Sequence, residues 1–193
     1  MRRLGYRVVD LLVERIAGLD ADRAWQGASR AELEARLREP PPAGPRPFDA
    51  VLERLARDVL PYAGRIDHPR FFAFIPSCPT WPGILGDFLA AGFNIFQGTW
   101  LESAGPSQVE LVVLDWFKEW VGYPPGAAGV LVSGGSAANL IALACAREAR
   151  AGARAAEAVV YLSAESHSSM ERAARILGFP RARVRVLPVD GAR

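Results

Sequence analysis

The sequence predicts an α/β protein in which a helical N-terminal arm precedes the start of a mostly parallel sheet. Residues 1–60 repeat apolar side chains at helical spacing and contain no cluster of polar groups that could do chemistry. From Gly129 onward, short apolar runs alternate with helical patterns in the order strand, helix, strand, helix, strand. That order indicates parallel strands joined by right-handed helical crossovers.

The arm is expected to contain two or three helices on stiff connectors. Apolar residues at helical spacing predict a first helix over 3–17. Ser29 with Glu32 three residues later is a capping-box pattern that opens a second, short helix. The proline-rich segment 40–47 excludes helix and central strand, so it is expected to be an extended connector. Helical spacing returns over 48–60.

The middle of the chain combines ordered loop with two helices. Residues 67–96 are dense in aromatic, proline and glycine residues, with one buried helix predicted at 83–91. Such a long loop is often functional, although its aromatic side chains can also serve only to bury it. Ser107 and Glu110 form a second capping-box pattern, which predicts a helix to about Val121. We expect its apolar side chains to be largely buried: Leu111, Leu114, Trp116, Phe117 and Trp120.

The last third is expected to supply three strands and two crossover helices. Strands are predicted at 129–132, 158–162 and 184–187, and helices at 136–151 and at 168–177, the latter closed by Gly178. In parallel sheets, ligands bind beyond the carboxyl ends of the strands. The segments 133–136 and 163–167 follow the first two strands and are therefore the candidate site.

Composition narrows the class of protein. The chain of 193 residues has a net charge of +2 from scattered arginines, without the basic block of a nucleic-acid-binding protein. It has no apolar run long enough to span a membrane. Cys78 and Cys145 form no metal or disulfide framework, and each is expected to be buried. We therefore expect a soluble, cytoplasmic protein without a metal site.

The first strand end, Ser133-Gly134-Gly135-Ser136, has the features of an anion site. A helix N-terminus offers unpaired N–H groups and a partial positive charge. Gly134 and Gly135 allow close backbone approach, and Ser136 adds a hydroxyl donor at the first turn, so a phosphate could bind here. The same residues also suit an ordinary capping turn. The pattern is neither a Walker loop nor a dinucleotide fingerprint.

The second strand end contains His167, one of two histidines in the chain. It stands directly before a predicted helix, where it could cap the helix or lie partly buried. Beside a flat aromatic ligand it would instead stack on the ring and lie near a reacting carboxylate.

Together these motifs resemble the pyridoxal-phosphate-dependent group II amino acid decarboxylases, the group of the aromatic-L-amino-acid and glutamate decarboxylases. The resemblance covers nearly the whole chain and lies in five blocks in the family's order: Gly5–Asp10, His68–Phe74, Asp115–Trp116, Ser133–Leu140 and Ser166–Gly178. One departure is Ala137, which replaces the family's usual glutamate. We expect the phosphate turn to survive this change, with the loss of one acidic interaction in the first helical turn.

The resemblance implies a fold and an assembly. Residues 61–193 would be the N-terminal, incomplete part of a fold type I large domain that binds pyridoxal 5'-phosphate. Residues 1–60 would be a dimerisation arm wrapped around a second copy in a homodimer.

The resemblance also implies roles for individual residues. Gly135 and Ser136 would hold the cofactor phosphate. His167 would be catalytic, stacking on the pyridine ring near the substrate carboxylate. Phe74, Pro76 and Ser77 would line the substrate pocket.

The implied reaction is decarboxylation of an L-amino acid to an amine and CO2. The family's Schiff-base lysine and ring-nitrogen aspartate lie downstream of the His167 block. The single lysine here, Lys118, is in the wrong place and is expected to be a solvated surface residue. We therefore expect these 193 residues to be an N-terminal part that does not decarboxylate alone.

Two alternatives remain open at this stage. One keeps the fold and cofactor but makes the protein an aminotransferase or another carbon–carbon lyase, against which the His-Pro-Arg-Phe-Phe block argues. The other is a truncated, non-catalytic chain that acts in dimerisation or binding. Among substrates, the aromatic side chains between Phe71 and Phe96 favour an aromatic L-amino acid.

Overall fold

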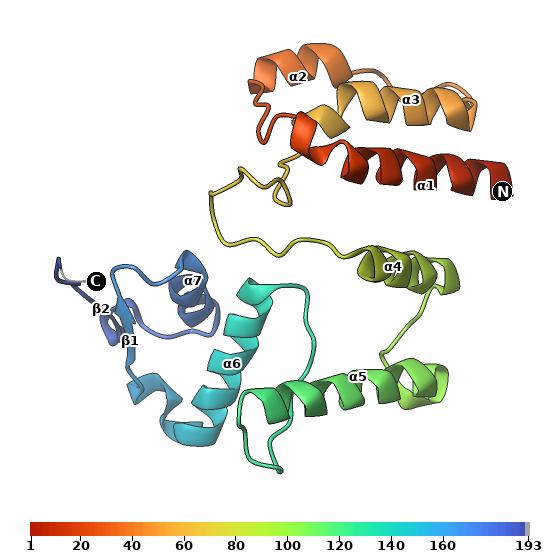
Figure 1. The fold of residues 1–193 in the computed structure, drawn as a ribbon. Coiled ribbons are helices and arrows are strands. Elements are labelled where there is room, and N and C mark those ends of the chain that lie inside the picture. Colours follow the sequence, from red (N-terminus) through yellow and green to blue (C-terminus); the bar gives the residue numbers. More distant parts are fainter. Residues whose placement is uncertain (192–193) are drawn as a thin grey trace. The chain divides into compact units, whose positions relative to one another are not determined.

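The three helices predicted in residues 1–60 are present, and the third ends at Asp58, two residues before its predicted end. In the computed structural model, which describes residues 1–191, α1 covers Arg2–Ala17, α2 covers Arg30–Leu37 and α3 covers Phe48–Asp58 (Figure 1). The capping box is confirmed. The Glu32 N–H donates to Ser29 Oγ at 3.2 Å, and the Ser29 N–H donates to the Glu32 carboxylate at 2.7 Å. The proline-rich connector contains neither helix nor strand, as expected.

The chain divides into two compact units, Met1–Asn94 and Ile95–Arg193. Short 3-10 helices accompany the longer elements in both: η1 Leu19–Ala21, η2 Leu60–Tyr62, η3 Gly152–Glu157 and η4 Arg181–Arg183. The sequence predicts a different division, with a dimerisation arm over residues 1–60 and a large domain from residue 61. That division is defined by contact with a second copy, so it stays a prediction.

Ion pairs connect α1 to other parts of the first unit. Leu52 on α3 is the one buried apolar side chain in residues 1–94, all of which the structure describes. Arg3 on α1 donates to Asp49 on α3 at 2.9 Å. Arg15, at the other end of α1, donates to both carboxylate oxygens of Asp67 at 2.6 Å each. These pairs fix α1 against α3 and against the loop that follows α3.

The predicted helix in the aromatic segment is present, but it is not buried. α4 covers Trp81–Phe93, with the Thr80 hydroxyl accepting from the Gly83 N–H at 3.3 Å and a left-handed Asn94 ending it. Two of its three aromatic side chains are exposed, Phe88 at 65% and Phe93 at 78%, and Trp81 is half-buried. The expectation of burial was wrong, because α4 contains no buried residue.

α5 is longer than the second capping-box pattern predicts. It covers Trp100–Trp120, with Thr99 rather than Ser107 as N-cap, and its backbone breaks at Ser103 (φ −147°, ψ 51°). Pro106 lies three residues after this break, in the first turn of the second segment, where a proline is tolerated. The predicted start of this helix at Ser107 was therefore wrong, because α5 includes a further helical segment that begins at Trp100.

The burial expected for the apolar side chains of α5 and for the two cysteines was also wrong. Trp116, Phe117 and Trp120 are 51%, 49% and 70% exposed, and both cysteines are exposed free thiols. The apolar pattern of a helix predicts which of its side chains become buried when a second layer of structure packs against it. Within residues 95–191 no such layer covers α5.

The core of the second unit lies around a parallel strand–helix–strand motif. β1 (Val160–Ser163) pairs in parallel with β2 (Val184–Leu187), with Val160 opposite Val184, and α7 (Ser168–Ile176) connects them. α6 (Gly135–Arg150) lies beside α7 (Figure 1). The buried apolar side chains here are Leu162, Ala173, Ala174 and Phe179. The parallel pairing of β1 with β2 and the crossover helix between them, α7, are confirmed, and α6 is present as a helix.

The strand predicted at 129–132 does not form. This segment is neither helix nor strand, and the Leu131 N–H donates to the Glu110 carboxylate of α5 at 2.9 Å. A strand needs a partner ladder for its N–H and C=O groups. Here a side chain satisfies one of those groups, and β1 pairs with β2 alone among residues 1–191.

Among residues 1–191, no helix is both long enough and apolar enough to cross a membrane.

The ion pair between Arg15 and Asp67 generates a pH prediction. The Arg15 guanidinium, through its hydrogen bonds, lowers the pKa of Asp67 from its ordinary value of 3.8. Because the folded-state pKa is lowered, the stabilisation is fully present above about pH 4 and is lost as pH falls through the folded-state value. We expect Asp67→Asn to lower the free energy of unfolding at pH 7 by about 1–2 kcal/mol.

Urea unfolding at pH 7 and at about pH 3 checks this, because the difference between wild type and Asp67→Asn should shrink at the lower pH. Asp20→Asn is the matched control, since Asp20 is exposed and has no ion pair within residues 1–191. A deficit of equal size at both pH values would contradict the assigned role of the pair.

Candidate functional site

The turn before α6 depends on the backbone of Gly134. This residue is the N-cap of α6 and has φ 100° and ψ 167°, a region essentially restricted to glycine. Its carbonyl accepts from the N–H groups of Ala137 and Ala138 at 3.1 Å each, which starts the helix. The extended segment before it thus turns directly into α6.

The N-terminus of α6 is open to a ligand. No side chain caps it, and the first turn carries no acidic residue, as the alanine at position 137 predicts. A Cβ added to Gly135 would meet no atom within 4 Å, so the first residue of the helix is not crowded on that side. Unpaired N–H groups, the helix dipole and the Ser136 hydroxyl together suit a phosphate.

His167 caps α7, as one of its two interpretations predicted. Its Nδ1 accepts from the Ser169 N–H at 3.2 Å. The residue is nevertheless exposed, and its Nε2 has no hydrogen-bond partner among residues 1–191. One ring nitrogen therefore serves the helix, while the other is available to a ligand.

A hydrogen bond joins α6, one turn after its start, to the first turn of α7. Asn139 Nδ2 donates to Ser169 Oγ at 2.8 Å, and Ser169 Oγ lies 2.8 Å from His167 Nδ1. The structure therefore brings the Gly135–Ser136 turn and His167 together at neighbouring helix N-termini. Neither Asn139 nor Ser169 was assigned a role from sequence. The signal available in the sequence was spacing: Asn139 lies one helical turn after Gly135, and Ser169 lies two residues after His167.

The predicted substrate residues belong to the first unit. Phe74, Pro76 and Ser77 are exposed in the loop before α4, and Phe74 has a φ of 63°. A positive φ is uncommon for a bulky residue and marks local strain. Their contact with a substrate stays a prediction.

His68 anchors the start of that loop. It is only 3% exposed; its Nε2 lies 3.1 Å from the Asp22 carbonyl, and its Nδ1 accepts from the Arg70 N–H at 3.0 Å. With one nitrogen accepting from Arg70, the other donates to the carbonyl. The histidine of the His-Pro-Arg-Phe-Phe block thus fixes the backbone from which Phe74 extends.

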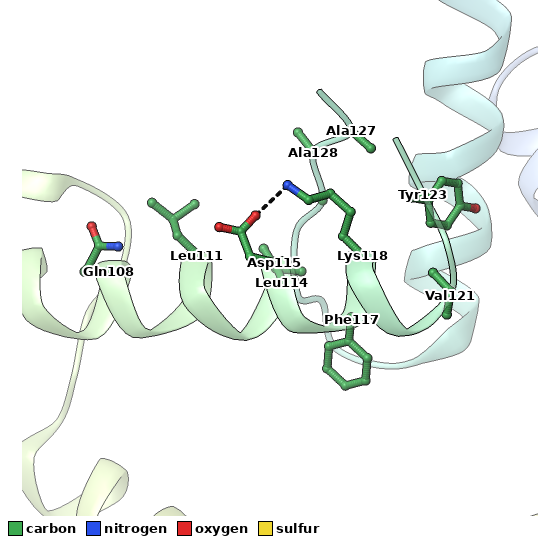
Figure 2. Close-up of a pocket in the computed structure, with 11 residues that line it drawn as sticks. Gln108, Leu111, Leu114, Asp115, Phe117, Lys118, Val121, Tyr123, Ala127 and Ala128 are labelled. Atoms are coloured by element: carbon green, nitrogen blue, oxygen red, sulfur yellow. Dashed lines mark hydrogen bonds and ion pairs between the residues drawn. The ribbon is translucent and has the colours of Figure 1, made fainter. Parts of the chain in front are cut away.

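A pocket of about 600 Å³ lies on α5 and the segment after it, and none of the predicted site residues lines it (Figure 2). At its edge, Lys118 Nζ donates to Asp115 Oδ1 at 2.6 Å and to the Pro125 carbonyl at 3.1 Å. Pocket volume alone would favour this place. Its one ion pair is already satisfied, however, so the chemistry favours the open N-terminus of α6. Lys118 is also partly covered, with a side chain 23% exposed, rather than fully solvated.

Among residues 1–191, no group of three or more histidine, cysteine, aspartate or glutamate side chains could hold a metal ion.

Comparison with known proteins identifies the family. The model of the pyridoxal-dependent decarboxylase conserved domain matches residues 31–193. An aromatic-L-amino-acid decarboxylase of Bacillus atrophaeus is 39% identical over 179 residues, which cover 93% of this chain and 37% of the relative. A tyrosine decarboxylase of Oryza sativa subsp. japonica is 34% identical over 199 residues, with 97% and 37% covered.

Solved structures agree with this assignment. The crystal structure of Oryza sativa TDC with PLP and tryptamine is similar to this chain with a TM-score of 0.88 and 27% identity, over 97% of this chain and 41% of that one. The chain thus spans 37–41% of the length of these relatives. The predicted α/β fold is confirmed, and the chain belongs to the family of pyridoxal-dependent decarboxylases.

Proposed function

We propose that the protein binds pyridoxal 5'-phosphate through Gly135, Ser136 and His167 and decarboxylates an aromatic L-amino acid to its amine and CO2. The observation that carries this proposal is the open N-terminus of α6, joined by hydrogen bonds to the His167 cap of α7. The names of the relatives, which include aromatic-L-amino-acid and tyrosine decarboxylases, support the substrate class.

The α6 terminus would bind the phosphate. The N–H groups of Gly135 and Ser136 and the Ser136 hydroxyl would donate to its oxygens, because no side chain competes for them. Ala137 leaves the first turn without a negative charge, so the positive end of the helix dipole acts on the phosphate undiminished.

His167 would orient the ring and the reacting group. When bound, pyridoxal phosphate supplies the electron sink that allows an amino acid to lose its carboxylate. The imidazole of His167, held through Nδ1, would stack on the pyridine ring with Nε2 near the substrate carboxylate. In this role the residue binds and orients, because its ring cannot turn without breaking the cap.

The loop Phe74–Ser77 would select the substrate. Phe74 is 89% exposed and strained in φ, a combination that costs stability and favours a role outside the fold. An exposed aromatic ring is suited to contact an aromatic substrate side chain.

The assembly we propose is a cytoplasmic homodimer in which residues 1–60 contact a second copy. Exposed apolar side chains on the arm, Tyr6, Val13 and Val51 among them, support a protein contact there.

Loss of the Ser136 hydroxyl tests the phosphate site. Pyridoxamine 5'-phosphate, which forms no covalent bond with a lysine, is the probe, and pyridoxamine without the phosphate is its reference. We expect the phosphorylated probe to bind more tightly and Ser136→Ala to weaken it about tenfold, the loss of one charge-assisted hydrogen bond. Isothermal titration calorimetry measures both affinities.

Ser107→Ala on α5 is the matched control and should leave the affinity of the probe unchanged. Equal affinity for pyridoxamine and its phosphate would refute a phosphate site at α6.

The reaction is tested by product analysis of the protein isolated from its source, supplied with pyridoxal phosphate and L-tyrosine, L-tryptophan or L-glutamate. We expect equimolar amine and CO2 from the aromatic substrates, detected by mass spectrometry and CO2 release. A 2-oxo acid would indicate an aminotransferase instead. Cofactor binding without any product would leave the non-catalytic alternative.

Phe74 is tested against Phe72, which is equally exposed at 89% but lacks the positive φ. We expect Phe74→Ala to lower kcat/KM for the preferred aromatic substrate about tenfold through loss of an aromatic contact. Phe72→Ala should change it less than about twofold on the same reasoning. Equal effects of the two substitutions would remove the special role of Phe74.

A further inference from the structure

We propose that Asn139 and Ser169 are positioning residues that fix the ring orientation and the tautomer of His167, on whose proposed function this role rests. Their side chains make no hydrogen bond to Gly135 or Ser136 among residues 1–191, yet they connect α6 to the one imidazole at the site.

The direction of the chain of hydrogen bonds follows from its first member. The amide nitrogen of Asn139 can only donate, so Ser169 Oγ accepts its proton at 2.8 Å. The hydroxyl proton of Ser169 is then free to point at His167 Nδ1, also at 2.8 Å. The order of donation is therefore Asn139 to Ser169 to His167.

A second donor also makes His167 Nδ1 an acceptor. The Ser169 N–H also points at His167 Nδ1, at 3.2 Å. With two donors aimed at it, Nδ1 serves as acceptor and the proton of the neutral ring lies on Nε2. Ser169 is only 2% exposed, so water has little access to replace these bonds.

This arrangement has a consequence for recognition. An Nε2 that carries the proton presents a donor to a ligand, and a carboxylate is an acceptor. The opposite tautomer would present a lone pair to a carboxylate and repel it. Asn139 lies one helical turn after Gly135, so the same side chain ties the imidazole to the helix that would bind the phosphate.

The test is nitrogen NMR of the protein labelled with 15N-histidine at about pH 8, above the ordinary titration range of histidine. His167 should show an unprotonated Nδ1 and a protonated Nε2. Asn139→Asp keeps the shape but turns the donor into an acceptor, so the Ser169 hydroxyl would rotate toward the introduced carboxylate. We expect the share of Nδ1-protonated ring to rise about fivefold, the equivalent of one hydrogen bond.

Ser169→Ala should produce a similar rise, and Ser169→Thr, which keeps the hydroxyl, should restore the wild-type tautomer. Asn94→Asp is the matched control, since Asn94 lies outside this chain of bonds. His68 is the internal reference and should stay unchanged in every variant. A protonated Nδ1 in the wild type, or an unchanged His167 in both Asn139→Asp and Ser169→Ala, would overturn the proposal.

Binding of pyridoxamine 5'-phosphate separates the two proposals. If the tautomer responds as expected but the probe does not bind, the positioning role stands and the cofactor site fails. If the probe binds and the tautomer does not respond, the cofactor site stands and the positioning role fails.

Discussion

The backbone of Gly134 is the constraint on which the candidate site depends. At φ 100° and ψ 167°, a residue with a Cβ would be strained even though a Cβ there would meet no neighbour within 4 Å. The turn made by this glycine sets where α6 begins. Because α6 begins there, the Gly135 and Ser136 N–H groups stay unpaired and Asn139 reaches Ser169 on α7. The anion site and the histidine network thus follow from one backbone conformation.

The structural and the functional interpretation of His167 are compatible, because the two ring nitrogens have different roles. Nδ1 accepts from the first turn of α7, which is an ordinary helix cap. That bond leaves Nε2 as the free end of an imidazole that cannot rotate. A capping histidine is therefore a suitable ligand-facing residue, since its helix supplies the rigidity that a surface histidine lacks.

What the sequence could predict was local. The capping box at Ser29 and the left-handed Gly178 each depend on a few neighbouring residues, and the structure has both. The parallel pairing of β1 with β2 spans a single helical crossover and is also present. The burial of Trp120 and the strand at 129–132 depend on partners distant in the chain, and both expectations were wrong. The site divides in the same way: Gly135, Ser136 and His167 stand out as motif residues, while the bond between Asn139 and Ser169 exists only once two helices pack.

The energies of these interactions show that helix packing stabilises the second unit, while hydrogen bonds orient its site. A buried hydrogen bond contributes about 1 kcal/mol net, so the two bonds through Ser169 Oγ are too weak to hold α6 against α7 on their own. Ala173 and Ala174 on α7 are almost fully buried, and side chains this small let the helix lie close to its neighbours. Packing therefore sets the distance between the helices, and the polar chain selects one ring orientation and one tautomer among the arrangements that this distance allows. A network of such small energy matters little for folding, but an energy of this size is enough to decide which nitrogen of His167 carries the proton.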